Sequence, residues 1–122
     1  MLASRATAQT FTNLHSFAGG TEGAYSFSGL ALSGSTLFGT TANGGSSGNG
    51  TVFAINTDGS GFTNLYSFTT TFGGINSDGA NPKASLLLRD GTLYGTTPKG
   101  GISGFGTVFA VSTNGTGLFY PA

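Results

Sequence analysis

The sequence repeats itself, and the length of the repeat limits the folds that the chain can adopt. The heptad Phe-Thr-Asn-Leu-His-Ser-Phe at residues 11–17 recurs at residues 62–68 with Tyr in place of His. A second match pairs residues 37–41 with residues 93–97, and in each copy a Gly-Gly loop and a Gly-Thr-Val-Phe-Ala strand follow. Repeats of roughly fifty residues are typical of propeller blades and solenoid turns.

Alternating apolar residues and turn signals predict four short strands in one unit, around residues 30–33, 37–41, 51–56 and 62–68. The short links Ser33-Gly34-Ser35 and Arg89-Asp90-Gly91 suit hairpins. Four strands in this length match one propeller blade. We therefore expect an all-β fold of antiparallel four-stranded blades of β-propeller type, with two repeats per chain. A parallel β-helix is the alternative, although its coils are shorter and lack Asp-Gly hairpins.

The predicted organisation has three parts. Residues 1–10 end in an Ala-x-Ala pattern and are expected to be the tail of a signal peptide or an unstructured arm. Residues 11–61 form the first repeat, and residues 62–122 form the second repeat with an incomplete final strand. In the leading heptad, alternation puts Phe11, Asn13, His15 and Phe17 on one side of a strand, where the aromatic rings are expected to pack between blades.

Composition excludes several functional classes. Charged residues make up 7% of the chain, and four basic residues balance four acidic ones, so no basic surface is available for nucleic acid or an anionic membrane. No apolar run approaches the length of a membrane-spanning helix. There is no Cys for a disulfide or a thiolate metal site. Eleven Phe and four Tyr provide enough aromatic surface for a folded core.

The motifs Leu-Tyr-Gly-Thr-Thr, Gly-Gly, Gly-Thr-Val-Phe and Leu-Tyr-Ser-Phe, in that cyclic order, resemble the bacterial GloVer tandem repeats of secreted choice-of-anchor proteins. The likeness covers most of residues 11–117, and Asp78-Gly79-Ala80-Asn81-Pro82 resembles an acidic-Gly-x-x-Pro segment of the family. The first copy departs from that segment at residues 22–26. The resemblance implies an exported bacterial β-repeat protein, secreted or at the cell surface, without an established enzymatic activity.

Family members usually carry more copies, and two blades cannot close a ring of about four to eight. The leading heptad has no preceding blade, and the last copy lacks a full heptad. We therefore expect self-association through blade edges or further repeats. In one form of this hypothesis, three or four chains assemble into one propeller. The alternative is a truncated reading frame.

Few residues are suited to catalysis. The single His, His15, corresponds to Tyr66 in the repeat and is interpreted as an aromatic packing position. All four acids, Glu22, Asp58, Asp78 and Asp90, precede Gly, which favours turns over a pair of catalytic carboxylates. Residues 56–61 only partly resemble a Ca²⁺ loop, because the bidentate Glu is missing. We expect no catalytic residue, metal site or cofactor.

The glycine-rich loops at residues 44–50 and 100–106 lead into strands, which argues against a phosphate site at a helix N-terminus. They are interpreted as tight connections. A speculative alternative is a neutral polar ligand such as a glycan. Its candidate binding residues are Thr40, Thr41, Tyr66, Tyr94, Thr96 and Thr97. The leading hypothesis is a non-enzymatic, exported structural or adhesive surface module, and the alternative is a glycan-binding module assembled from several chains.

Overall fold

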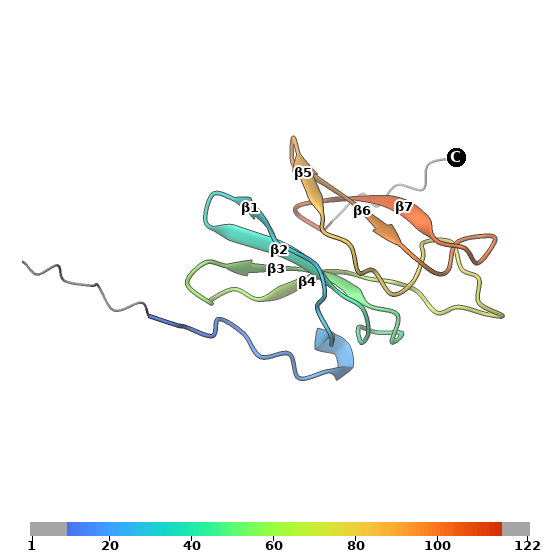
Figure 1. Ribbon diagram of the computed structural model, residues 1–122, viewed down its shortest axis with the longest axis horizontal. Helices are drawn as coiled ribbons and strands as arrows, with labels where there is room; N and C mark the ends of the chain where they lie inside the picture. Colours follow the sequence, from blue (N-terminus) through green and yellow to red (C-terminus); the bar gives the residue numbers. More distant parts are fainter. Residues whose placement is uncertain (1–9, 116–122) are drawn as a thin grey trace, which may run out of the picture.

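The computed structural model describes residues 10–115, which form seven strands in two antiparallel sheets (Figure 1). The first sheet has four strands in the order β1-β2-β3-β4, and the second has three in the order β5-β6-β7. Every named strand pair is antiparallel, so the parallel β-helix is wrong. The bounds are β1 Ala31–Ser33, β2 Thr36–Thr41, β3 Thr51–Asn56, β4 Thr63–Ser67, β5 Leu87–Arg89, β6 Thr92–Thr97 and β7 Thr107–Ser112.

The all-β class and the predicted strands of the first unit are confirmed, each within a residue or two of its expected bounds. A single 3-10 turn, η1 (Gly20–Glu22), is the helical element among the described residues. No helix in this part of the chain is long and apolar enough to cross a membrane. The two sheets do not close on themselves, so a propeller is not formed within residues 10–115. The predicted signal-peptide pattern lies almost wholly outside the described residues.

The hairpins form where the turn residues predict them. Asp90 and Gly91 link β5 to β6, and both have positive φ angles, 50° and 75°. Gly34 does the same between β1 and β2 with a φ of 59°. Asp, Asn and Gly tolerate this left-handed backbone, and it matches the twist of the flanking strands. The turn residues therefore set the register of both outer hairpins.

Strand β4 belongs to the second sequence repeat but forms hydrogen bonds to β3 of the first sheet. Its pairing shifts at a β-bulge between Val52 and Phe53. The bulge interrupts strict alternation, so that Leu65, Tyr66 and Phe68 all pack against the core. The first sheet thus takes its last strand from the second sequence repeat. This arrangement links the two units through their backbone.

The leading heptad, residues 11–17, does not form a strand, contrary to the expectation. It runs along the first sheet on the face that carries Phe53, without a backbone ladder. Leu14 approaches Gly59 here as Leu65 approaches Gly115 in the second unit. The heptad thus occupies the place on the first unit that β4 occupies on the second. It has no edge to pair with, because no sheet precedes the first one in the described chain.

The core lies between the two sheets. The buried apolar cluster takes Phe38, Val52 and Ala54 from one face of the first sheet and its other members from the second unit and β4. On the second sheet, Phe109 packs over Gly95, where a Cβ atom would lie 2.5 Å from the ring. The remaining members are Phe68, Leu86, Leu93 and Val111. The two units therefore stack in series, with one face of the first against the opposite face of the second.

Candidate functional site

Three of the predicted ligand-binding residues are buried in the ladders. The hydroxyl of Thr41 lies 2.7 Å from that of Thr51 and donates to the carbonyl of Asn43 at 3.0 Å. Thr97 makes the equivalent contacts in the second unit, including one of 2.8 Å to Thr107. Thr40 is buried as well. The hydroxyls of Thr41 and Thr97 support the strand ends, whereas the buried hydroxyl of Thr40 has no hydrogen-bond partner among the described residues.

The other three predicted residues lie in two different places. The Tyr66 hydroxyl donates to Asp78, so it is engaged inside the protein. Tyr94 and Thr96 are both exposed on the outer face of β6. The structure therefore does not bring the six residues into one site, and only Tyr94 and Thr96 are accessible. Binding by these two remains a prediction.

The Asp78 carboxylate is a buried structural centre rather than part of a hairpin turn. It accepts hydrogen bonds from the Tyr66 hydroxyl, from the Thr69 N–H at 3.0 Å and from the Thr69 hydroxyl at 2.6 Å. Nearly all of its surface is covered. A buried carboxylate is tolerated when its oxygens are hydrogen-bonded. These bonds join the end of β4 to the loop that opens the second unit.

Glu22 has the same role in the first unit. Its Oε1 accepts a hydrogen bond from the Ala18 N–H at 2.7 Å and lies 3.0 Å from Nε2 of His15. His15 also stacks on Phe62 with ring centroids 4.0 Å apart. The aromatic packing assigned to His15 is therefore confirmed, with an acidic partner that the sequence interpretation did not include. An acidic-Gly pair follows the heptad in both copies, and this order was the available signal.

The prediction that acidic residues serve in turns is confirmed for Asp58 and Asp90. Asp58 accepts hydrogen bonds from the Ser60 hydroxyl at 2.5 Å and the Ser60 N–H at 2.9 Å, and these lower the pKa of the Asp58 carboxyl. Ser60 also contacts Asn56 across the same turn. The side-chain oxygens of Asp58 and Ser60 in the Ca²⁺-like segment are thus bonded to each other. Within residues 10–115, no cluster of three or more His, Cys, Asp or Glu could hold a metal.

The glycine-rich loops are tight connections, as predicted. In the first, Gly50 donates its N–H to the Gly44 carbonyl at 2.9 Å, and Gly45 donates to Gly20 at 2.8 Å. In the second, the Gly101 N–H instead donates to Oδ1 of Asn76 at 2.8 Å. These amides are therefore engaged within the protein rather than presented to a ligand.

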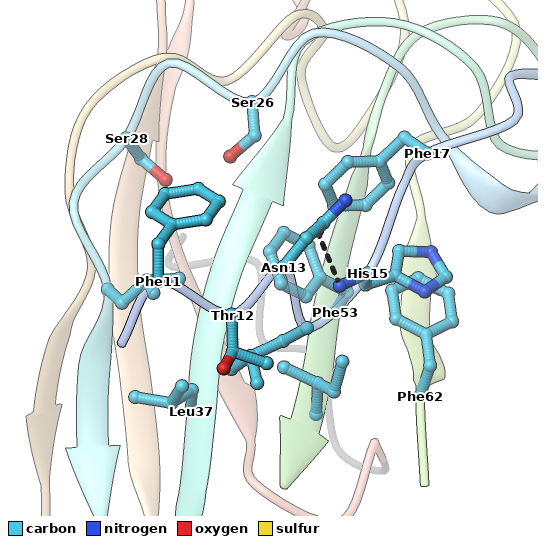
Figure 2. Close-up of a pocket in the computed structure, with 13 residues that line it drawn as sticks. Phe11, Thr12, Asn13, His15, Phe17, Ser26, Ser28, Leu37, Phe53 and Phe62 are labelled. Carbon is cyan, nitrogen blue, oxygen red and sulfur yellow. Dashed lines mark hydrogen bonds between the residues drawn. The ribbon is translucent and has the colours of Figure 1, made fainter. Parts of the chain in front are cut away.

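An accessible groove with aromatic walls lies on the first unit (Figure 2). Its volume is about 310 Å³, and it runs between the leading heptad and the face of the first sheet that carries Phe53. Hydroxyl and amide groups line part of it, and Asn13 accepts a 3.1 Å hydrogen bond from the His15 N–H. Its lining residues come from five separate segments, which is why sequence patterns did not reveal it. The apolar lining is Phe11, Leu14, Phe17, Leu30, Leu37, Phe53, Ile55 and Phe62.

The fold and the site define an all-β repeat protein in which successive antiparallel units stack in series. A family model described as the Gloeobacter/Verrucomicrobia repeat matches residues 2–120. The chain belongs to this family, which confirms the resemblance drawn from the motifs. The search of curated proteins returned no match, and neither did the search of solved structures.

Proposed function

We propose that the chain is a non-enzymatic, exported repeat module with a structural or adhesive role at the cell surface. The observation that carries the proposal is the use of its polar groups in internal support. The carboxylates of Glu22 and Asp78 hold the heptads against the loops, and Asp58 closes a turn. Family membership supports the repeat character. The family resemblance and the Ala-x-Ala pattern support the proposal of export.

We also propose that each sheet is a blade of β-propeller type. The strand order β1-β2-β3-β4, with neighbours in sequence paired as antiparallel neighbours in space, is the order of a propeller blade. Two blades leave faces and edges uncovered, which supports self-association with further copies or repeats.

The localisation is tested by fractionating the bacterium that encodes the chain and probing each fraction with an antibody raised against residues 10–115. Signal in the medium, or cell-bound signal that external protease removes from intact cells, is the expected result. Signal confined to a protease-protected cytosolic fraction would contradict export. An adhesive role predicts that beads coated with the purified chain are retained on cells or matrix, whereas beads coated with albumin are not.

Glycan binding is a second candidate, favoured by the groove. Sugar rings pack their C–H faces on aromatic side chains, while a few polar groups fix their orientation. The groove combines the exposed ring of Phe11 and the ring of Phe62 with the polar groups of Thr12, Asn13 and Ser26. Saturable binding on a glycan array, lost in Phe11→Ala and kept in Phe105→Ala, is expected. Phe105 is equally exposed but lies in a distant loop. No signal at high protein density would count against this function.

A further inference from the structure

The outer face of the second sheet lacks the cover that its counterpart in the first sheet has. Tyr94 is 42% exposed, whereas Phe38, at the same place in the first unit, is 4% exposed. Val108 is 66% exposed, whereas Val52 is fully buried. The covered positions face the second unit in the core. The same strand positions thus form a packed interface in one unit and an open apolar face in the other.

The groove on the first unit is the open counterpart of a surface that is covered in the second unit. In the second unit, the equivalent surface receives the face that contains Phe38, Val52 and Ala54. Leu86 on that surface is 8% exposed, whereas its counterpart Leu30 in the groove is 54% exposed. The groove residues Leu14, Phe17, Leu30, Leu37, Phe53 and Ile55 correspond to Leu65, Phe68, Leu86, Leu93, Phe109 and Val111. The groove is therefore a copy of the internal interface with its occupant absent.

The polar residues that distinguish the two copies also suit contact between the outer face and the groove. Tyr94 stands where the covered face has Phe38, so a docked Tyr94 needs a partner for its hydroxyl. Ser26 and Ser28 line the groove where the second unit has Pro82 and Ala84 (Figure 2). Their hydroxyls can bond to a phenol, whereas Pro82 and Ala84 offer no polar side-chain group. An added hydroxyl on one face thus corresponds to added hydroxyls on the other.

The backbone provides a third match. In the described chain, β7 is an edge strand that pairs only with β6, whereas its counterpart β3 also pairs with β4. The heptad that supplies β4 is repeated almost unchanged at residues 11–17, where it has no ladder. An unpaired edge is a template for another strand. The register of β4 on β3 would set Thr12 opposite Ala110 and Asn13 opposite Phe109.

We propose that a second copy of this chain docks head to tail, with its residues 11–17 paired to β7 and its groove closed over the outer face of the second sheet. The proposal deepens the repeat-module function by naming the partner and both contacting surfaces. The two contacting surfaces differ, so the contact is heterologous and extends to a ring or a filament. The docked face comprises Leu87, Tyr94, Thr96, Val108 and Ala110.

The first test measures mass by sedimentation velocity over a concentration series of the full chain. We expect oligomers, and at least tenfold weaker association for both Val108→Lys and Leu30→Lys, because each buries an unpaired ammonium. Ile102→Lys is the matched control, since Ile102 is also exposed but lies outside both surfaces. Circular dichroism checks folding, and Leu87→Lys replaces Val108→Lys if that variant does not fold.

Mixing the two variants makes the test specific. Val108→Lys retains the groove and Leu30→Lys retains the outer face, so each alone should remain monomeric while their mixture forms a one-to-one pair. The natural chain has no Cys. A mixture of Thr12→Cys and Ala110→Cys should therefore form a disulfide-linked pair under mild oxidation, and Thr12→Cys with Ile102→Cys should not.

A chain that stays monomeric at all concentrations would overturn the proposal, as would association unaffected by Val108→Lys and Leu30→Lys. A monomer that is nevertheless found at the cell surface would refute the docking alone and leave the exported module intact. A groove that binds a glycan in the monomer, with no association of chains, would also overturn the docking.

Discussion

At the scale of the residue, equivalent positions in the two units perform the same task with different chemistry. Glu22 is partly exposed and contacts His15, whereas Asp78 is buried and accepts a hydrogen bond from the Tyr66 hydroxyl. In both units the carboxylate also binds the backbone N–H just after the heptad, that of Ala18 or Thr69. The shared feature is therefore a carboxylate that caps the end of the heptad.

Removing the two carboxylates should have unequal effects. Asp78→Ala removes a buried carboxylate that accepts hydrogen bonds from Tyr66 and Thr69, and we expect it to lower the free energy of unfolding by about 2–3 kcal/mol. Glu22→Ala should cost about 1 kcal/mol or less, because water can reach its donors. Urea denaturation followed by circular dichroism measures both. If the two variants lost equal amounts of unfolding free energy, the difference in burial would not explain their stability.

The Asp58 turn should give a small dependence of stability on pH. Its pKa is lowered by the hydrogen bonds from Ser60, so the stabilisation is present above the ordinary value of 3.8 and is lost as the pH falls through the lower folded pKa. Asp58→Asn is a close match, because Asn114 stands at this position in the other unit. We expect the Tm of the natural chain to exceed that of Asp58→Asn at pH 6, with a gap that narrows below pH 3.8. A gap that is constant from pH 6 to pH 2 would be inconsistent with this origin.

At the scale of the element, the glycine-rich loops act as compact hairpin connections. The loop between β2 and β3 folds back so closely that a Cβ atom on Gly50 would lie 2.3 Å from the Thr41 carbonyl oxygen. Gly106 is equally close to the Thr97 carbonyl, at 2.2 Å. The strand ends can therefore meet only where these positions carry no side chain.

Two glycines of the same loop separate steric contact from backbone strain. Gly48 and Gly50 have φ angles of 80° and 100°. A Cβ atom added at Gly48 would have no neighbour within 4 Å, whereas one added at Gly50 would clash with its neighbours. Gly48→Ala should cost about 1–2 kcal/mol from the left-handed backbone alone. Gly50→Ala should cost a further 1–3 kcal/mol or so from the clash. Thermal denaturation of both variants measures the difference, and equal Tm values would argue against the close packing of this loop.

At the scale of the whole molecule, the two sheets are stabilised by one shared core. Phe68 is fully buried and packs edge to face on Phe109, with ring centroids 5.1 Å apart. Phe17 and Phe53 make the equivalent contact on the first unit, also at 5.1 Å. Because Phe68 follows β4 of the first sheet and packs on the second, the two sheets should unfold together.

Phe68→Ala should therefore lower the free energy of unfolding by about 3–5 kcal/mol, within a single transition. Domains of this size have a total stability of about 5–15 kcal/mol, so this variant should be only marginally folded. Phe72→Ala, at an exposed Phe four residues away, is the control and should change little. The chain has no Trp, so Tyr fluorescence and circular dichroism follow the transition. Two separate transitions would show that the sheets unfold independently.

Much of the fold follows from local patterns. The repeat, the alternation and the Asp-Gly turns predicted the strands of the first unit and the hairpins, because pleat and turn geometry depend on neighbouring residues. The candidate site could not be predicted from such local patterns. Thr41 and Tyr94 both belong to the Leu-x-Gly-Thr-Thr motif, yet one is buried in a ladder and the other is exposed. Position along a strand does not say which face another sheet covers.

The sequence by itself determined that this is an all-β protein of two equivalent units, because its periodicities and turn residues act over a few bonds. Only the tertiary structure decided that a β-bulge shifts the pairing of β4 on β3, that Asp78 caps a heptad, and that residues 11–17 lie along a groove without a ladder. These features depend on a β-bulge and on contacts between segments far apart in the chain. Such contacts form only when the two sheets pack together and exclude water from the face between them.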